Sequence, residues 1–150
     1  MVKRCLNVRW CDNMKVKLDN GAKLPTRAFP TDAGLDIYAL HDGVVRAGKS
    51  ATFRTGVHIQ LPPNCMGDIR PKSGLMFNHG ILTFGTVDEG FSGEVMIHLF
   101  NLSDKNYWVT KGDKIAQLVV SHVRYEPVEI VDEIDGGERG QAGYGSTGLR

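Results

Sequence analysis

The sequence lacks most features that mark membrane, secreted or strongly polyanion-binding proteins. No apolar run approaches the roughly 18 residues of a membrane-spanning helix. The opening stretch, MVKRCLNVRWCDNMKVKL, alternates apolar and charged residues, which is unlike a secretory signal. The formal net charge is only +1, so charge alone indicates neither a nucleic acid nor a membrane as partner. A local phosphate site needs only a few well-placed cations and stays open.

Cysteine is also scarce. The chain has three cysteines, Cys5, Cys11 and Cys65, and none has a Cys or His at the spacing of a zinc site. An odd number of cysteines with no such spacing is typical of reduced, partly buried thiols. We therefore expect a cytoplasmic protein with neither a disulfide framework nor a zinc centre.

Alternating apolar and polar side chains recur along the chain and predict half-buried β-strands. The alternating apolar residues are Leu6, Val8 and Trp10; Met14, Val16 and Leu18; Leu35, Ile37 and Ala39; and Val57, Ile59 and Leu61. Two later stretches, GEVMIHLFNL (93–102) and DKIAQLVVSHV (113–123), carry apolar residues on both faces. They predict central strands buried between two layers. The alternating pattern from Val128 to Ile134 also predicts a strand.

Short turn sequences rich in Gly, Pro, Asn and Asp separate these stretches, so the 150 residues predict one all-β domain, a sandwich or barrel. Only SGLMFNHG looks helical, with Ser73 as its cap, Leu75 to Phe77 packing inward and Gly80 ending it. After Ile134 the sequence DGGERGQAGYGSTGLR has no apolar periodicity. It predicts a segment that is mobile without a ligand.

Taken alone, four polar stretches are weak signals of function. DAGLDIYA reads as a turn entering a strand. RPKSGL is either a phosphate site before a helix or a capped surface turn. GTVDEGFSGEV places one Asp on a glycine-flanked hairpin, which is also ordinary turn chemistry. KGDKIAQLVV carries Gln117 on an apolar strand, so Gln117 is either a satisfied core amide or a site residue.

The order of five stretches is more specific. DAGLDIYA, RPKSGL, GTVDEGFSGEV, GDKIAQLVV and RGQAGYGSTG resemble, in this order, the five motifs of the trimeric dUTPase family, from about Lys15 to the C-terminus. The resemblance implies a jelly-roll-like β-barrel of the dUTPase-like β-clip type, formed by residues 1–134, with residues 1–14 as an extra strand or arm. Residues 135–150 are expected to form a mobile glycine-rich lid.

The resemblance also implies a homotrimer and a reaction. The reaction is Mg²⁺-dependent hydrolysis of dUTP to dUMP and pyrophosphate, which keeps uracil out of DNA and supplies dUMP for thymidylate synthesis. Three active sites are expected between subunits. In each, the first, second and fourth motifs of one subunit face the third motif of a neighbour, and the tail arrives from the third subunit.

The catalytic roles follow by position in the motifs. Asp88 matches the general base for water attack on the α-phosphorus, a reaction that needs a base and compensating cations. Glu89 should point to the opposite side, because adjacent strand residues alternate. Gln117 matches the glutamine near the α-phosphate and the water. Asp36 matches the aspartate that holds water molecules around Mg²⁺, an ion that loses water reluctantly.

The second motif is expected to bind phosphate through Lys72, Ser73 and Gly74. Lys72 stands where the family usually has arginine, and a lysine is a point charge that cannot form a planar fork. Arg70 either compensates for this change or pairs with a carboxylate on the same strand face.

The third motif is expected to bind the nucleoside. Backbone groups of the hairpin from Leu82 to Met96 are implied to select uracil, with Thr86 and Val87 among them. Phe91 replaces a tyrosine that packs on deoxyribose; its ring should still exclude a 2′-hydroxyl, with the loss of one hydrogen bond.

The tail is expected to complete the site. Arg139 matches the arginine that reaches the γ-phosphate, and Tyr144 matches the aromatic residue that stacks on uracil. The residues Gly145, Ser146 and Thr147 match further γ-phosphate contacts.

Two other readings stay open. A dCTP deaminase, or a bifunctional deaminase-pyrophosphatase, shares the implied fold but acts on the cytosine amino group. A non-catalytic binding module, in which a nucleotide-bound tail acts as a switch, belongs to a different class of protein.

Overall fold

The structure, a computed structural model, describes residues 13–138 and residue 140. The expected strand at Leu6, Val8 and Trp10 lies outside these residues. The elements are β1 (Lys15–Leu18), β2 (Gly34–Tyr38), β3 (Gly43–Val45), β4 (Ser50–Phe53), β5 (Val57–Gln60), β6 (Cys65–Arg70), α1 (Ser73–His79), β7 (Ile81–Leu82), β8 (Gly85–Val87), β9 (Ile97–Asn101), β10 (Tyr107–Val109) and β11 (Lys114–His122). The described chain is therefore mostly β, with one short helix.

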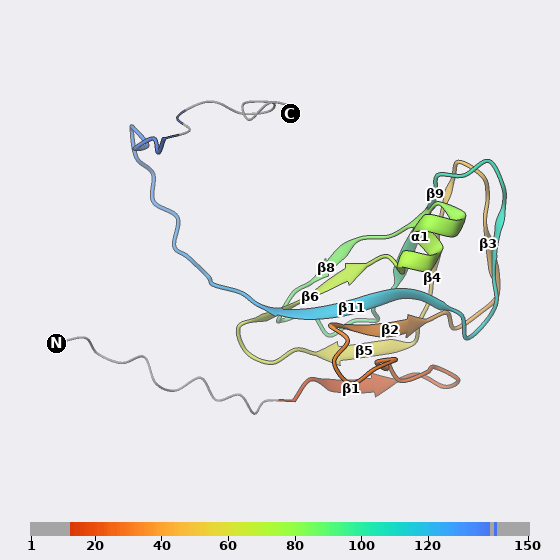
Figure 1. Ribbon diagram of the computed structural model, residues 1–150. Helices are drawn as coiled ribbons and strands as arrows, with labels where there is room; N and C mark the ends of the chain where they lie inside the picture. The colour runs from red at the N-terminus through yellow and green to blue at the C-terminus, as the bar shows by residue number, and fades with distance from the viewer. Residues whose placement is uncertain (1–12, 139, 141–150) are drawn as a thin grey trace.

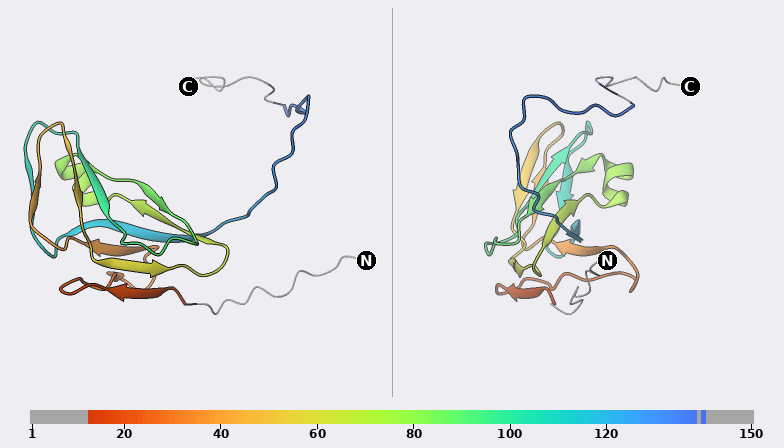
Figure 2. Two further views of the ribbon diagram at one scale, coloured as in Figure 1. Left: turned by 180° about the vertical axis from the view of Figure 1, so that it is seen from behind. Right: turned by 90° about the vertical axis from the view of Figure 1, so that its left-hand side faces the viewer.

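The strands pair into four antiparallel sheets (Figures 1 and 2). The largest has the order β2-β11-β6-β8, a second has the order β4-β9-β7, and β1-β5 and β10-β3 form two-stranded sheets. Within the described residues the strands do not close into one barrel. Most neighbouring strands are distant in sequence. The longest of them, β11, lies between β2 and β6 and so brings the first and second motifs side by side.

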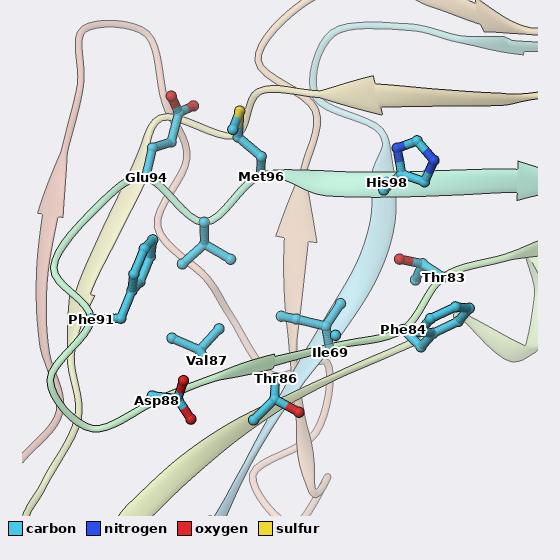
Figure 3. A pocket seen from close by; sticks show the side chains of 12 residues that line it. Ile69, Thr83, Phe84, Thr86, Val87, Asp88, Phe91, Glu94, Met96 and His98 are labelled. Carbon is cyan, nitrogen blue, oxygen red and sulfur yellow. The ribbon is translucent and has the colours of Figure 1, made fainter.

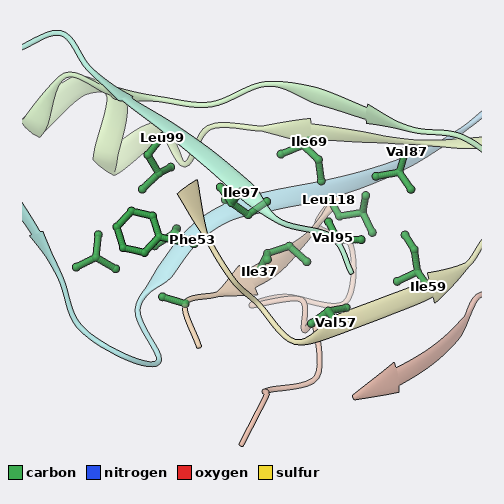
Figure 4. Packing of buried hydrophobic residues seen from close by; sticks show 14 of the residues in the cluster. Ile37, Phe53, Val57, Ile59, Ile69, Val87, Val95, Ile97, Leu99 and Leu118 are labelled. Carbon is green, nitrogen blue, oxygen red and sulfur yellow. The ribbon is translucent and has the colours of Figure 1, made fainter. Parts of the chain in front are cut away.

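The core lies between the inner face of the β2-β11-β6-β8 sheet and the strands that face it (Figure 4). Leu118 on β11 and Ile69 on β6 are paired and buried, and on the facing side Phe53, Ile97 and Leu99 are buried. Side chains alternate between the two faces of a strand. The apolar residues of the large sheet therefore fill the core, and its polar residues lie on the outer face.

A β-bulge in β11 changes this alternation. The pairing with β2 shifts between Lys114 and Ala116, and both Ile115 and Ala116 are buried. A bulge inserts one extra residue and turns the following side chains over. Lys114 and Gln117, three residues apart, therefore both lie on the outer face, where a regular strand would place them on opposite faces.

Some strand predictions are confirmed and two are wrong. The alternating stretches at Met14–Leu18, Leu35–Ala39 and Val57–Leu61 coincide with β1, β2 and β5. The stretch 93–102 is buried on one face only, because none of the residues that the structure describes forms a second layer over the other face, where 56% of Met96 is exposed. Residues 128–134 form no strand, since none of the strands in residues 13–138 pairs with them, and the chain after β11 leads away from the body (Figure 1).

The predicted helix is confirmed, although its details differ. Gly80 ends α1 with a left-handed φ of 66°, a conformation that glycine adopts at little cost. Lys72, not Ser73, is the N-cap residue, and no side chain caps the helix. Phe77 is 79% exposed, because a helix of two turns on the rim of a sheet can turn only one side toward the core. Among the described residues, no helix has both the length and the apolar character that a bilayer span requires.

Candidate active site

Three motif residues form a row across the outer face of the large sheet. Gln117 on β11 pairs with Asp36 on β2 at one side and with Arg70 on β6 at the other. Directly opposed residues of antiparallel strands point to the same face. The pairing of the strands thus places side chains from the first, second and fourth motifs next to one another.

Gly34 makes room for the glutamine in this row. A Cβ atom at Gly34 would lie 2.2 Å from Gln117 Oε1, far inside van der Waals contact. Gln117 Nε2 donates a hydrogen bond to the carbonyl oxygen of Pro71 at 3.0 Å. The amide therefore lies over the glycine, with its nitrogen held toward the segment that enters α1. Gln117 is half-buried on the outer face, so it is not an amide of the hydrophobic core.

Asp36 is the most buried charged group of the row, with only 4% of the residue exposed. Its Oδ1 accepts a hydrogen bond from the ammonium group of Lys72. Its Oδ2 lies 2.7 Å from Lys114 Nζ, off the direction of a well-formed hydrogen bond. Burial, the largest influence, would raise the pKa of Asp36, but the contacts with Lys114 and Lys72 together hold that pKa below its usual 3.8.

The second motif contributes one cation to this group and directs another elsewhere. Lys72 pairs with Asp36, as above, whereas Arg70 Nε lies 2.6 Å from Oδ2 of Asp68. Of the two readings of Arg70, pairing with a carboxylate on the same strand face is the one observed. Ser73 and Gly74 are exposed at the start of α1.

A pocket of about 280 Å³ opens within the third motif (Figure 3). It forms because β8 pairs with β6 rather than with β9, so the two arms of the expected hairpin separate. Asp88 and Phe91 lie on the loop at one end of the pocket, and Met96 lies on the arm that leads to β9. The full lining comprises Ile69, Thr83, Phe84, Gly85, Thr86, Val87, Asp88, Phe91, Glu94, Val95, Met96 and His98.

Two glutamates anchor the loop that carries Asp88 and Phe91. Glu89 turns away from the pocket, and its Oε2 accepts hydrogen bonds from the backbone N–H of Asn64 at 3.0 Å and from the Tyr125 hydroxyl at 2.6 Å. Of the pair, only Asp88 lines the pocket, as expected, but the cause is the turn that follows β8 and not the alternation of a strand. At the other end of the loop, Glu94 is bound to the β4–β5 turn.

Glu94 has three donors around its carboxylate. Oε1 accepts the backbone N–H groups of Thr55 at 3.0 Å and of Gly56 at 2.7 Å, and Oε2 lies 2.9 Å from Arg54 Nε. Burial, the largest influence, would raise the pKa of Glu94, but the hydrogen bonds from Gly56, Arg54 and Thr55 hold it below its usual 4.5. Sequence reasoning missed this residue, because its partners lie in a turn about forty positions earlier that carries no motif.

The structure thus divides the candidate residues into two groups. One contains Asp36, Lys72 and Gln117, joined by Lys114, which sequence reasoning missed. The other is the pocket, which includes Thr86, Val87, Asp88, Phe91 and Met96. Within the described part of the chain, no hydrogen bond or ion pair joins the two groups. Leu82 lies in β7 and does not line the pocket.

The expected tail contacts Arg139, Tyr144, Gly145, Ser146 and Thr147 lie outside the described residues. The structure therefore leaves their roles as predictions.

The donor groups of this site fit one kind of metal binding. Among the described residues, no three His, Cys, Asp or Glu side chains gather as a metal cage. Asp36 instead offers a single buried carboxylate, with Oδ2 lacking a well-formed hydrogen bond. Mg²⁺ usually keeps several water molecules and is bound through one or two carboxylates and the phosphates of a substrate. The site thus fits Mg²⁺ that arrives with a phosphate ligand.

Known proteins of one family resemble this chain in sequence and fold. The dUTPase family model matches residues 20–148. The deoxyuridine 5'-triphosphate nucleotidohydrolase of Clostridium acetobutylicum is 43% identical over 142 residues, covering 92% of this chain and 98% of that protein. The protein of that name from Kluyveromyces lactis is 40% identical over 140 residues, covering 91% and 95%. A solved mutant dUTPase of Staphylococcus bacteriophage 80alpha with dUpNHpp has a TM-score of 0.87 and 25% identity, covering 93% of this chain and 100% of that one. The chain therefore belongs to the dUTPase family.

Proposed function

We propose that this dUTPase hydrolyses dUTP to dUMP and pyrophosphate by attack of water on the α-phosphorus, in the presence of Mg²⁺. The observation that carries the proposal is the open hairpin of the third motif, with the Asp88 carboxylate at one end of an otherwise mostly apolar pocket. The pocket can take a nucleoside, and Asp88 can take the proton of a water molecule. The family supports this choice of substrate, since the phage 80alpha enzyme was solved with dUpNHpp.

The pocket residues divide by chemistry. Backbone groups near Thr86 and Val87 are proposed to recognise uracil. Among the described strands, none pairs with β8 on its pocket side, so its backbone groups there can act as a pairing edge. Phe91 is 44% exposed, and its ring is proposed to pack against deoxyribose. An aromatic surface there leaves no room for a 2′-hydroxyl and offers it no hydrogen bond.

The group of Asp36, Lys72, Lys114 and Gln117 is proposed to bind the triphosphate. Lys72, with Ser73 and Gly74 at the start of α1, contacts phosphate oxygens, and Gln117 orients the attacking water near the α-phosphate. Asp36 would hold Mg²⁺ through water, and the ion, when bound with the triphosphate, offsets charge on its oxygens. The ammonium groups of Lys72 and Lys114 exceed the charge of Asp36 by one, which favours an anion here.

The separation of the two groups supports a site shared between chains. We propose a homotrimer of jelly-roll-like barrels, in which the pocket of one subunit faces the group of Asp36, Lys72 and Gln117 on a neighbour. Residues 135–150 are proposed as the lid of a third. We also propose a cytoplasmic location, because the substrate is an intracellular nucleotide.

The deciding experiment is a pyrophosphate-release assay with dUTP, dTTP, dCTP and UTP, with Mg²⁺ and with chelator. Rapid release from dUTP alone, abolished by chelator, is expected. Formation of dUTP or dUMP from dCTP would instead favour the deaminase reading.

A variant tests the general base. Asp88→Asn keeps the shape of the side chain but removes the base, so turnover should fall about 10²- to 10⁴-fold while dUpNHpp binding changes little. Asp104→Asn, an exposed carboxylate on the loop after β9, is the matched control. An Asp88→Asn variant with near wild-type turnover would contradict the assignment.

A further inference from the structure

One carboxylate oxygen connects three segments that are far apart in the sequence. Oε2 of Glu89 accepts hydrogen bonds from the backbone N–H of Asn64 at 3.0 Å and from the hydroxyl of Tyr125 at 2.6 Å. Asn64 lies in the turn between β5 and β6, and Tyr125 follows the end of β11. Glu89 therefore ties the loop of the third motif to two elements of the sheet framework.

The framework around Asn64 and Tyr125 is held by contacts of its own. Asn64 adopts a left-handed φ of 58°, and its carbonyl oxygen accepts the backbone N–H of Val123 at 2.8 Å. Beside it, Cys65 Sγ lies 3.7 Å from His122 Nδ1. The turn and the end of β11 are thus joined to each other independently of Glu89, and they provide a fixed anchor for it.

The loop, in contrast, has little of its own to fix it. Between Val87 and Glu94 it contains Gly90 and Gly93, and its one internal backbone hydrogen bond runs from Phe91 N–H to the Asp88 carbonyl. Glycine adds conformational freedom to a segment. Without an anchor at Glu89, the direction of the Asp88 side chain would be set by the end of β8, one residue before it, and by the bond from Phe91. The remaining ties of the loop, from His58 Nδ1 to the Ser92 carbonyl at 3.3 Å and at Glu94, lie farther along the chain.

We propose that Glu89 is a positioning residue for the reaction: its ties to Asn64 and Tyr125 hold the loop so that the Asp88 carboxylate faces the pocket. The inference rests on the proposed role of Asp88 as general base. The physical reason is that Glu89 directly follows Asp88 in a tight turn, closed by the hydrogen bond from the Phe91 N–H to the Asp88 carbonyl. Holding the Glu89 side chain outside the pocket therefore restricts the backbone that directs the Asp88 side chain toward it. A catalytic group misplaced by about 1 Å can cost about 100-fold in rate.

The chemistry of Tyr125 suits it as a donor in this tie. The hydrogen bond to Glu89, together with partial burial and nearby negative charge, raises the pKa of the Tyr125 phenol above its usual 10. The phenol therefore stays protonated at neutral pH and continues to donate. The tie needs an acceptor oxygen at position 89, and it does not need a charge there.

Three variants separate the acceptor oxygen from the charge at position 89. Glu89→Ala removes the acceptor, Glu89→Gln keeps an amide oxygen in its place, and Tyr125→Phe removes one donor. Steady-state dUTP hydrolysis with Mg²⁺ is measured for each variant and for the double variant Glu89→Ala/Tyr125→Phe, beside thermal unfolding. We expect kcat to fall about 10- to 100-fold in Glu89→Ala with KM changed less than about threefold, because the pocket surfaces remain.

Glu89→Gln should keep kcat within about threefold of wild type, and Tyr125→Phe should lose less than Glu89→Ala. The double variant should be no slower than Glu89→Ala, because the two changes break the same tie. If Glu89→Ala does not fold, the ranking of Glu89→Gln above Tyr125→Phe in kcat decides the question.

The outcomes separate this inference from the proposed function. A slow Asp88→Asn enzyme beside a Glu89→Ala enzyme with wild-type kcat would overturn the positioning role and leave the proposed function intact. Equal losses in Glu89→Ala and Glu89→Gln would also overturn it, since charge and not the tie would then matter. Near wild-type turnover of Asp88→Asn would remove the base assignment on which the inference rests.

Discussion

Replacing Glu94 by alanine should destabilise the protein more than most substitutions, although the side chain is charged and lies beside a loop. Its Oε1 alone accepts two backbone N–H groups, from Thr55 and Gly56. Both residues are buried, with Thr55 only 1% exposed. Removing the carboxylate therefore leaves two donors without a protein partner in a place that water reaches poorly.

The magnitude follows from these contacts. A hydrogen bond to a charged group contributes about 1.5–3 kcal/mol, and a buried donor left unpaired costs about 1–3 kcal/mol. The ion pair with Arg54 adds less, because that arginine side chain is 53% exposed and is screened by solvent. We expect Glu94→Ala to lower the free energy of unfolding by about 3–5 kcal/mol, which lowers Tm by roughly 6–20 °C for a chain of this size.

Glu94→Gln separates the two backbone contacts from the charge. The amide oxygen can still accept both N–H groups, but its NH₂ group faces the Arg54 donor. The expected loss is about 1–2 kcal/mol. The control is Glu129→Gln, an exposed carboxylate with no hydrogen bond or ion pair among the described residues, which should leave stability unchanged.

The pH dependence gives an independent test of the same contacts. The native pKa of Glu94 lies below its usual 4.5, so the unfolded chain binds the proton more readily than the native one does. The stabilisation by its charge is then complete above pH 4.5 and is lost as the pH falls through the native pKa. Urea unfolding at one fixed protein concentration should show a constant gap between wild type and Glu94→Gln from pH 7 to about 5 that narrows in more acid solution. A gap independent of pH, or a loss below about 1 kcal/mol in Glu94→Ala, would refute this reasoning.

Three further predictions concern the candidate site. Gly34→Ala should lower kcat for dUTP hydrolysis with little effect on Tm, because the added methyl group displaces the Gln117 amide; an unchanged kcat would contradict that role. Lys114→Met should raise the pKa of Asp36, since it removes one of two cations that lower it, and an NMR titration of the Asp36 carboxyl carbon measures the shift. Removing the residues after Glu138 should abolish turnover while the number of subunits in the assembly, measured by light scattering, stays the same. A fully active truncated enzyme would contradict the proposed lid.

The strands that bury one face against the core were predictable from the sequence. Leu35 and Ile37 alternate with polar residues because only one side of β2 reaches the core, and the same holds for Val57 and Ile59 on β5. The order of the five motifs supplied the family. These two signals are local or linear, and they need no knowledge of which strands pair.

The contacts that depend on pairing were not predictable. Lys114 reaches Asp36 only because a bulge turns β11 over, and the segment KIAQ has no glycine or proline to announce a bulge. The alternating pattern after Val128 predicted a strand, but a strand also requires a neighbour with free backbone groups, and the described part of the chain places none beside it. Glu89 likewise finds its partners in a turn and in the segment after β11, which only the fold brings near.

The lysine at position 72 takes on a clearer meaning once its partner is known. In this structure the ammonium group of Lys72 rests on Asp36, so contact with a phosphate, as we propose, requires it to leave. A buried carboxylate that loses its only cationic partner strongly destabilises the folded state. Lys114, 2.7 Å from the other oxygen, keeps Asp36 paired when Lys72 turns away. A flexible point charge can make that exchange, whereas a bidentate arginine fork would hold the carboxylate more firmly. The departure from arginine at position 72 and the bulge that delivers Lys114 therefore act together, and loss of Lys114 should affect triphosphate binding through Asp36 even without a direct contact to the nucleotide.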